Sequence, residues 1–286
     1  METSRETSRE GVQAETEAPQ EEVLVLPSQV SGDVDVHLYY RQAGHGQPLV
    51  WLHWLWGEPG WMSHHQQLAQ HFHLYVPDLP GYGRSTLPEW ATTPHGLAVV
   101  LLRFLDALSL QQPIVVGSCL GGWVGAELAV LRPERLARLV LIDPLGLVLD
   151  WTKIPNIFYA DPARLPSYFL TQPHTAQAQA YVPPLAEWSD TFLLNRITSI
   201  RLVFDPYLHS RTLVYHLPLL TTPSLVLWGE SDPLLGPEHA ALWTSHLPRA
   251  HSAIIPAGGH LPYVENGEAV VDAVHAFATS EEGEPQ

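Results

Sequence analysis

Short apolar runs and amphipathic stretches alternate along most of the chain. The apolar runs predict strands at residues 37–41, 49–53, 74–77, 114–117, 139–142, 224–228 and 252–255. Several are continuously apolar, as is typical of parallel strands that are covered by helices on both faces. Helical spacing between them predicts helices at 96–108, 121–131, 238–247 and 268–278. The alternation predicts an α/β fold with a doubly wound, mostly parallel sheet.

Residues 147–216 interrupt this alternation. They are rich in proline, leucine and aromatic residues and contain no clear strand before the pattern resumes at Ser224. We interpret them as a helical lid over the carboxyl edge of the sheet, where open α/β sheets bind ligands. The core is then expected in residues 23–146 and 217–279. The tails, 1–22 and 280–286, lack hydrophobic periodicity and are expected to be disordered.

The composition limits the classes of partner. Hydrophobic residues make up 45% of the 286 residues, enough for a large core, and the formal net charge is −16. Such an acidic surface repels nucleic acid and anionic membranes, so the expected partner is a small-molecule substrate. The chain has one cysteine, no stretch like a signal peptide and no apolar run long enough for a membrane span. We therefore expect a cytoplasmic protein, while its oligomeric state stays open.

The most informative segment is the turn around Cys119, between a predicted strand and a predicted helix. Gly117 and Gly121 stand two places on either side of it. A Gly-x-nucleophile-x-Gly pattern is typical of a strained elbow that presents a nucleophile and tolerates only small flanking residues. Ser118 fits less well, because bulky residues would then occupy the small positions. The positive end of the following helix would stabilise a thiolate. The alternative is a buried, unreactive thiol.

Two later turns supply candidate partners for this nucleophile. Asp232 and Glu230 lie in the turn after the predicted strand at 224–228, and His260 lies in a glycine-rich loop after the last predicted strand. His260 is one of 16 histidines, and its place in a strand-end loop beyond the acid singles it out. In the order nucleophile, acid, histidine, the imidazole would take the thiol proton and the acid would fix its tautomer.

Together these motifs resemble the capped α/β-hydrolases, the group that holds esterases, C–C hydrolases, epoxide hydrolases and haloalkane dehalogenases. The resemblance runs from about residue 23 to residue 278 and includes the loop at 76–85 and the elbow extension at 121–127. It implies the α/β-hydrolase fold. It favours Asp232 over Glu230, because the Trp-Gly-x-x-Asp-Pro spacing is that of the family's acid turn.

The resemblance also assigns roles to the loop at 53–57. By register, the backbone N–H groups of Leu55 and Leu120 form the oxyanion hole. The residues expected to line the substrate pocket are His53, Trp54 and Trp56.

Two positions depart from the family pattern. Cys119 stands where the family has Ser or Asp, and Asp is the nucleophile of dehalogenases and epoxide hydrolases, so those two activities are disfavoured. Trp54 replaces the glycine that usually follows His53, which narrows the pocket and changes the oxyanion loop. The elbow is similar to that of the Cys-His-Asp dienelactone hydrolases and polyester synthases, although the lid and chain length match neither.

The sequence therefore predicts a hydrolase that acts on a small apolar ester, lactone or thioester. Cys119, His260 and Asp232 would form its triad and an acyl-enzyme its intermediate. One alternative is an acyltransferase with the same triad. Another is a non-catalytic ligand-binding protein on a hydrolase scaffold, suggested by the two departures together.

Metal and nucleotide sites are not expected. His64, His65, His71 and His73 lack accompanying acidic or cysteine ligands at a suitable spacing, and we expect them on an exposed helix and its exit. The Gly-x-Gly at 81–83 lacks the third glycine and the context of a dinucleotide fingerprint, so no cofactor is implied.

Overall fold

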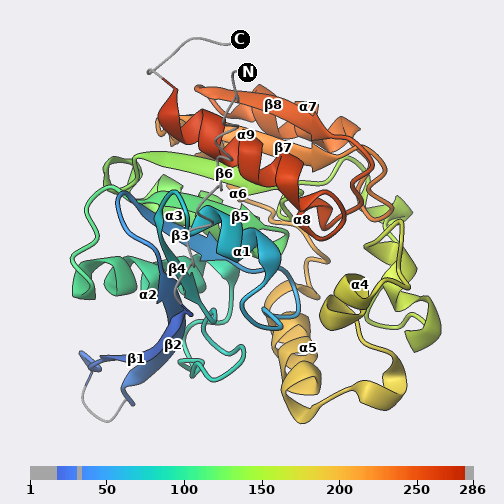
Figure 1. Ribbon diagram of the computed structural model, residues 1–286, viewed down its shortest axis with the longest axis horizontal. Coiled ribbons are helices and arrows are strands. Elements are labelled where there is room, and N and C mark those ends of the chain that lie inside the picture. The colour runs from blue at the N-terminus through green and yellow to red at the C-terminus, as the bar shows by residue number, and fades with distance from the viewer. Residues whose placement is uncertain (1–17, 31–33, 281–286) are drawn as a thin grey trace, which may run out of the picture.

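The computed structural model describes residues 18–30 and 34–280, and within them eight strands form one sheet. The strand order is β1-β2-β4-β3-β5-β6-β7-β8 (Figure 1). β1 pairs antiparallel with β2 and β2 with β4, while the remaining neighbours are parallel. The strands are β1 (Gln20–Leu26), β2 (Val36–Ala43), β3 (Pro48–Leu52), β4 (His73–Pro77), β5 (Ile114–Ser118), β6 (Arg138–Ile142), β7 (Ser224–Gly229) and β8 (Ala250–Ile255).

Helices cover both faces of this sheet. On one face α1 (Ser63–Leu68) packs against α9 (Gly267–Thr279), which follows the short helix α8 (Pro262–Glu265); on the other, α2 (Pro94–Ala107) packs against α3 (Leu120–Leu131) (Figure 1). Helix α7 (Glu238–His246) packs on β7 and β8. β5 and β7 are buried along their whole length, as expected for strands between two helical layers. The predicted α/β-hydrolase fold is confirmed. No described helix is both long and apolar enough to cross a bilayer.

The N-terminal boundary differs from the predicted one. Residues 20–22, which we assigned to a disordered tail, form the first half of β1. This edge strand was missed because it is polar and exposed, and it is held by backbone pairing with β2 and by Glu21 and Glu22, which bind Arg41 and Tyr40. The rest of the predicted tails, residues 1–17 and 281–286, lies outside the described residues. Ser280 is ordered and accepts hydrogen bonds from Arg138.

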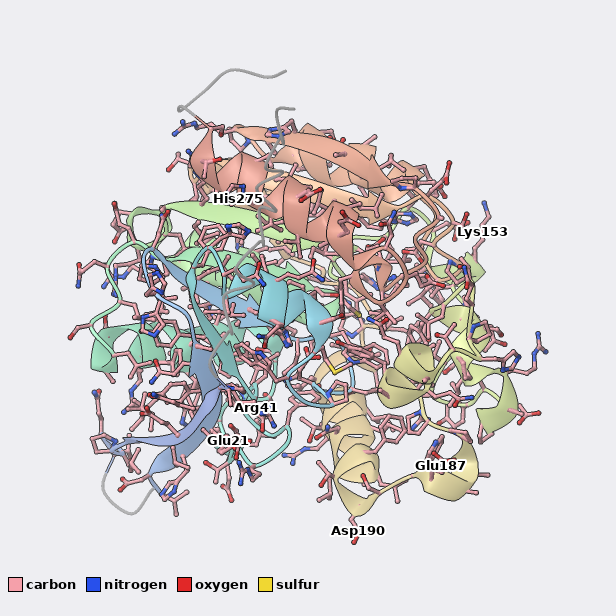
Figure 2. The ribbon with its side chains drawn as sticks, in the orientation of Figure 1. Glu21, Arg41, Lys153, Glu187, Asp190 and His275 are labelled. Carbon is pink, nitrogen blue, oxygen red and sulfur yellow. The ribbon has the colours of Figure 1, made fainter. Side chains whose placement is uncertain are left out.

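The insertion between β6 and β7, residues 147–216, contains no strand among its named elements. Its elements are the 3-10 turns η2 (Trp151–Lys153), η3 (Pro162–Tyr168) and η4 (Leu185–Glu187) and the helices α4 (Ala176–Tyr181), α5 (Asp190–Val203) and α6 (Leu213–His216). Figure 2 shows Glu187 and Asp190 at the outer end of this insertion. The short 3-10 turn η5 (Leu217–Leu219) leads back to the sheet.

Helix α5 carries an unusual pattern, since it buries polar side chains and exposes apolar ones. Asn195 donates to the carbonyl oxygen of Trp56 at 2.8 Å, and Thr198 donates to that of Gly81 at 2.8 Å. Ser199 donates to the carbonyl oxygen of Leu55. The outer residues are apolar and exposed, among them Leu194, Ile197 and Ile200. Hydrogen bonds therefore fasten α5 to the loops that follow β3 and β4.

Candidate active site

Cys119 lies at the tip of the turn between β5 and α3, in a strained backbone conformation. Its φ and ψ angles are 54° and −112°, which a non-glycine residue adopts only under strain. A Cβ atom added at Gly117 would lie 2.3 Å from the carbonyl oxygen of Gly121, and one added at Gly121 would lie 2.2 Å from that of Leu52. Both positions therefore require glycine, and this requirement fixes Cys119 as the central residue of the turn.

The structure brings His260 and Asp232 together behind Cys119. Nδ1 of His260 lies 2.7 Å from Oδ2 of Asp232, and both side chains are buried. The other carboxylate oxygen, Oδ1, accepts the backbone N–H groups of Leu234 and Leu235 at 2.8 and 3.0 Å. Glu230, the rival acid, is exposed and instead accepts the N–H of Ala257. Only the Asp232 carboxylate of these two is therefore positioned to orient the imidazole.

The charges around His260 favour its protonated form. Burial by itself lowers the pKa of the imidazole, but the charges of Asp232 and Cys119, with their hydrogen bonds, raise it well above its usual value. Nε2 is buried and has no aligned hydrogen-bond partner among the described residues. Catalytic hydrogen bonds are often poorly aligned in the absence of substrate. The imidazole is thus held at Nδ1, while its Nε2 is left without a hydrogen bond.

A second buried carboxyl group, Asp143, was missed by the sequence analysis. It directly follows β6 and has a positive φ of 42°. Its Oδ1 atom accepts the N–H of Gly229 at 2.9 Å, while Oδ2 has no partner among the described residues. Burial, and then the charge of Asp232, raise the pKa of Asp143 well above its usual value, which favours its protonated form. Its place directly after a parallel strand was the available signal, since such strand ends meet at one edge of the sheet.

The orientation of the predicted oxyanion donor Leu55 is set by His53. Nδ1 of His53 lies 2.7 Å from the carbonyl oxygen of Trp54, so it must carry the proton, and Nε2 accepts the N–H of Leu79 at 3.0 Å. Burial lowers the pKa of His53 to about 4, which keeps the ring neutral. In a trans peptide the Leu55 N–H points away from the Trp54 carbonyl. His53 thereby orients this N–H, and neither of its ring nitrogens is left to contact a substrate.

The second predicted donor, Leu120, is the first residue of α3. N–H groups in the first turn of a helix have no partner inside the helix, which leaves them available to an anion. The adjacent N–H of Gly121 donates to the carbonyl oxygen of His53 at 3.1 Å. This hydrogen bond joins the elbow to the loop that carries Leu55.

Aromatic rings form a wall beside His260. Trp54 and Trp56 are buried, with ring centroids 5.1 Å apart. Phe169, from the 147–216 insertion, contacts both of them, at 5.3 and 4.9 Å, and its ring centroid lies 5.9 Å from that of His260. The surroundings of the histidine are therefore apolar and screened from water.

The histidines at 64 and 65 are buried, so the expectation that they lie on an exposed helix is wrong. They also have an acidic neighbour, since Glu58, His64 and His65 bring ligand atoms within 4.8 Å of one another. The Met62 N–H donates to Nδ1 of His65 at 3.1 Å, which places the proton of this neutral ring on Nε2. Nε2 of His65 faces Nε2 of His64 at 3.0 Å. A protonated Nε2 cannot bind a metal ion, so the cluster is better described as hydrogen-bonded.

Asp143, Asp232 and His260 also bring ligand atoms within 4.8 Å of one another. Here the Nδ1–H of the histidine is already directed at a carboxylate oxygen.

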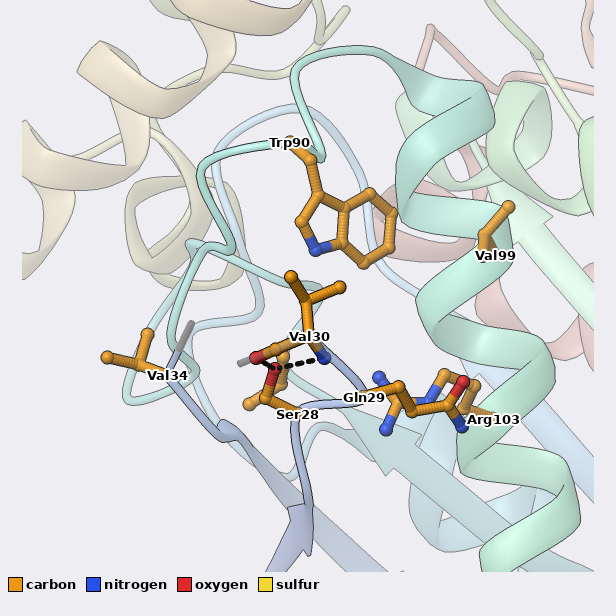
Figure 3. A pocket seen from close by; sticks show the side chains of 8 residues that line it. Ser28, Gln29, Val30, Val34, Trp90, Val99 and Arg103 are labelled. Carbon is orange, nitrogen blue, oxygen red and sulfur yellow. Dashed lines mark hydrogen bonds between the residues drawn. The ribbon is translucent and has the colours of Figure 1, made fainter. Parts of the chain in front are cut away.

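A pocket of about 200 Å³ elsewhere on the surface, next to the hairpin of β1 and β2, is lined in part by Val36, Trp90 and Arg103 (Figure 3). It contains no histidine or acid, and thus lacks the groups needed for acid–base catalysis.

Comparison with known proteins agrees with this fold. Residues 43–273 match the alpha/beta hydrolase family. The chain is 29% identical to a pimeloyl-acyl-carrier protein methyl ester esterase of Pectobacterium carotovorum, over 84% of this chain and 98% of that protein. It is 25% identical to a cis-3-alkyl-4-alkyloxetan-2-one decarboxylase of Shewanella oneidensis, over 86% of each. A serine hydrolase of carbazole degradation shares the fold, with a TM-score of 0.76, 21% identity and coverage of 92% and 99%. The chain is a member of the alpha/beta hydrolase family.

Proposed function

We propose that this protein is a carboxylic-ester hydrolase in which Cys119 is the nucleophile, His260 the general base and Asp232 the acid that orients it. The observation that carries the proposal is the 2.7 Å hydrogen bond between His260 and Asp232, directly behind a thiol on a strained elbow. This arrangement supports a nucleophilic triad, which is recognised by geometry and roles.

In the first half of the reaction, Nε2 of His260 takes the proton of the Cys119 thiol, and Sγ then attacks the ester carbonyl carbon. The carbonyl oxygen becomes an oxyanion and accepts the N–H groups of Leu55 and Leu120. The carbon–oxygen bond to the alcohol then breaks, and the departing oxygen takes the proton from Nε2. The products of this half-reaction are the free alcohol and a thioester on Cys119.

In the second half, water gives a proton to Nε2 of His260 as its oxygen attacks the thioester carbon. The carbon–sulfur bond breaks, the carboxylic acid leaves, and the sulfur recovers the proton. Throughout both halves Asp232 accepts the Nδ1–H hydrogen bond and stabilises the charged imidazole.

The surroundings of the triad favour a small, apolar acyl group. Cys119 and His260 are fully buried, and the wall beside them is formed by Trp54, Trp56 and Phe169. We propose that the 147–216 insertion acts as a lid, because it provides Phe169 and closes over these groups. The esterase name of the Pectobacterium relative supports ester over lactone or thioester chemistry.

The test is to mix the protein with 4-nitrophenyl butyrate, follow nitrophenolate release, and analyse acid-quenched samples by peptide mass spectrometry. We expect a burst of one equivalent and a butyryl adduct on Cys119, both abolished by Cys119→Ala. Exposed Ser245 provides the control, since Ser245→Ala keeps the burst. If no adduct forms between pH 6 and 9, the protein is a non-catalytic ligand-binding member of the family and the proposal fails. A Cys119→Ser variant that turns over faster than the wild type would show that the thiol is not matched to hydrolysis.

A further inference from the structure

Arg196 is a buried cation without an acidic partner. It lies on α5, and its guanidinium carbon stands 4.6 Å from the ring centre of Trp56 and 4.7 Å from that of Trp188. None of the ion pairs among the described residues includes it. Burial of an unpaired charge is costly, and two aromatic faces offset only part of that cost.

Two indole N–H groups, one of them in the Trp56 ring that lies beside Arg196, are also buried without acceptors. Nη1 of Arg196, Nε1 of Trp54 and Nε1 of Trp56 are inaccessible to water and have no hydrogen-bond partner among the described residues. Each of these groups can only donate. Leaving a buried donor unsatisfied is costly, and more so for a charged group. A set that contains only donors and one positive charge is complementary to an anion.

The donors are connected to the reacting groups through ring contacts. Trp56 contacts both Arg196 and Phe169, and Phe169 contacts His260. The acyl group of an ester on Cys119 would therefore have the aromatic wall beside it and the guanidinium beyond that wall.

Building on the proposed function, we infer that Arg196, Trp54 and Trp56 form a subsite for a carboxylate at the far end of the acyl chain. The substrate class is then the half-esters of short dicarboxylic acids. Two indole rings lie close to the guanidinium carbon, and the planar edge of a guanidinium matches a carboxylate in a bidentate pair. A single negative charge also balances the single buried cation.

The test compares kcat/KM for the mono-4-nitrophenyl esters of succinate, glutarate and adipate with kcat/KM for neutral 4-nitrophenyl esters of equal length. We expect the wild type to prefer at least one acidic ester tenfold or more. In Arg196→Met this ratio falls to about one. Arg201→Met is the matched control, because Arg201 lies exposed on the same helix and its loss leaves the ratio unchanged. Arg196→Lys, which keeps the charge but not the planar edge, gives an intermediate ratio and guards against loss of folding in Arg196→Met.

A binding measurement separates this inference from the proposed function. Titration of adipate and glutarate into Cys119→Ala protein, followed by calorimetry and tryptophan fluorescence, needs no chemistry. Binding that is lost in Cys119→Ala/Arg196→Met supports the subsite even if no ester is hydrolysed. If the protein hydrolyses neutral esters without preferring the acidic esters, and binds neither diacid, the subsite is overturned and the esterase proposal stands. An equal loss of the ratio in Arg201→Met overturns it as well.

Discussion

The carboxyl groups of Asp143 and Asp232 are both buried, and an oxygen atom of each lies within 4.8 Å of the other and of a ring nitrogen of His260. They come from neighbouring strand ends, after β6 and β7. Burial, and then the charge of Asp232, raise the pKa of Asp143 well above its usual value and favour its protonated form. Two like charges at this separation in an apolar site would not both persist.

This pair leads to a prediction about redundancy. Asp232→Asn should lower kcat/KM to about a hundredth of the wild-type value, because Asp143 can then ionise beside the imidazole. This loss is smaller than the roughly ten-thousandfold loss that is seen when a triad acid has no substitute. The double variant Asp143→Asn/Asp232→Asn has no substitute acid and should lose about a hundredfold more. Glu230→Gln is the control, as this exposed acid lies in the same turn. Steady-state kinetics on 4-nitrophenyl butyrate measure all of these variants. Equal activity in the single Asp232→Asn and the double variant would show that Asp143 provides no substitute.

The buried Glu58 predicts how stability depends on pH. Tyr181 and Trp51 donate to its carboxyl at 2.7 and 3.3 Å, yet burial is the largest effect and raises its pKa from 4.5 to about 8. The folded state therefore retains a proton that the unfolded state loses. This contribution makes stability fall as pH rises from 4.5 to 8, by at most about 1.4 kcal/mol per pH unit.

Glu58→Gln removes this titration. Urea unfolding at pH 5, 6, 7 and 8 should show a free energy of unfolding that depends less steeply on pH than in the wild type, with the largest gain at pH 8. Exposed Glu89 serves for comparison, because Glu89→Gln should leave the pH dependence as it is. If the free energies of unfolding of the wild type and Glu58→Gln differ by the same amount at every pH, the assignment is contradicted.

The glycines on either side of Cys119 predict a large loss of stability when one methyl group is added. Gly121→Ala places a Cβ atom against two backbone carbonyl groups, at 2.2 and 2.6 Å, and neither can move without displacing β3. We expect a loss of at least about 3 kcal/mol of stability, or no folded protein. Gly267→Ala meets no atom within 4 Å and should be close to neutral, which thermal unfolding can check. A stable Gly121→Ala protein would mean that the turn is built differently.

Ser199 links the insertion to the oxyanion loop, and its removal should affect stability and rate together. Ser199→Ala leaves the buried carbonyl oxygen of Leu55 without this donor. We expect the free energy of unfolding, measured with urea, to fall by about 1–3 kcal/mol. The Leu55 N–H is also less well held, so kcat should fall by about three- to tenfold. A variant that loses stability but keeps the wild-type kcat would show that His53 alone orients the loop.

Some expectations failed because the sequence shows periodicity but not proximity. β1 was missed, since an edge strand needs no apolar face to pair with its neighbour. His64 and His65 were placed at the surface, although Glu58, six residues earlier, lies against them in the folded chain. Arg196 and Ser199 carry no sequence signal, because helix α5 buries these polar side chains together with apolar ones and shows no simple amphipathic pattern.

The sequence by itself determined the elements that depend on local chemistry. Continuous apolar runs specify buried parallel strands, and two glycines around Cys119 specify a turn in which only small residues fit. The tertiary structure alone decided how the Asp232 carboxylate meets His260, where Asp143 lies and which loops α5 binds. These relationships join strand ends and helices that are up to about half the chain apart, so they arise from packing across the sheet edge and not from any local pattern.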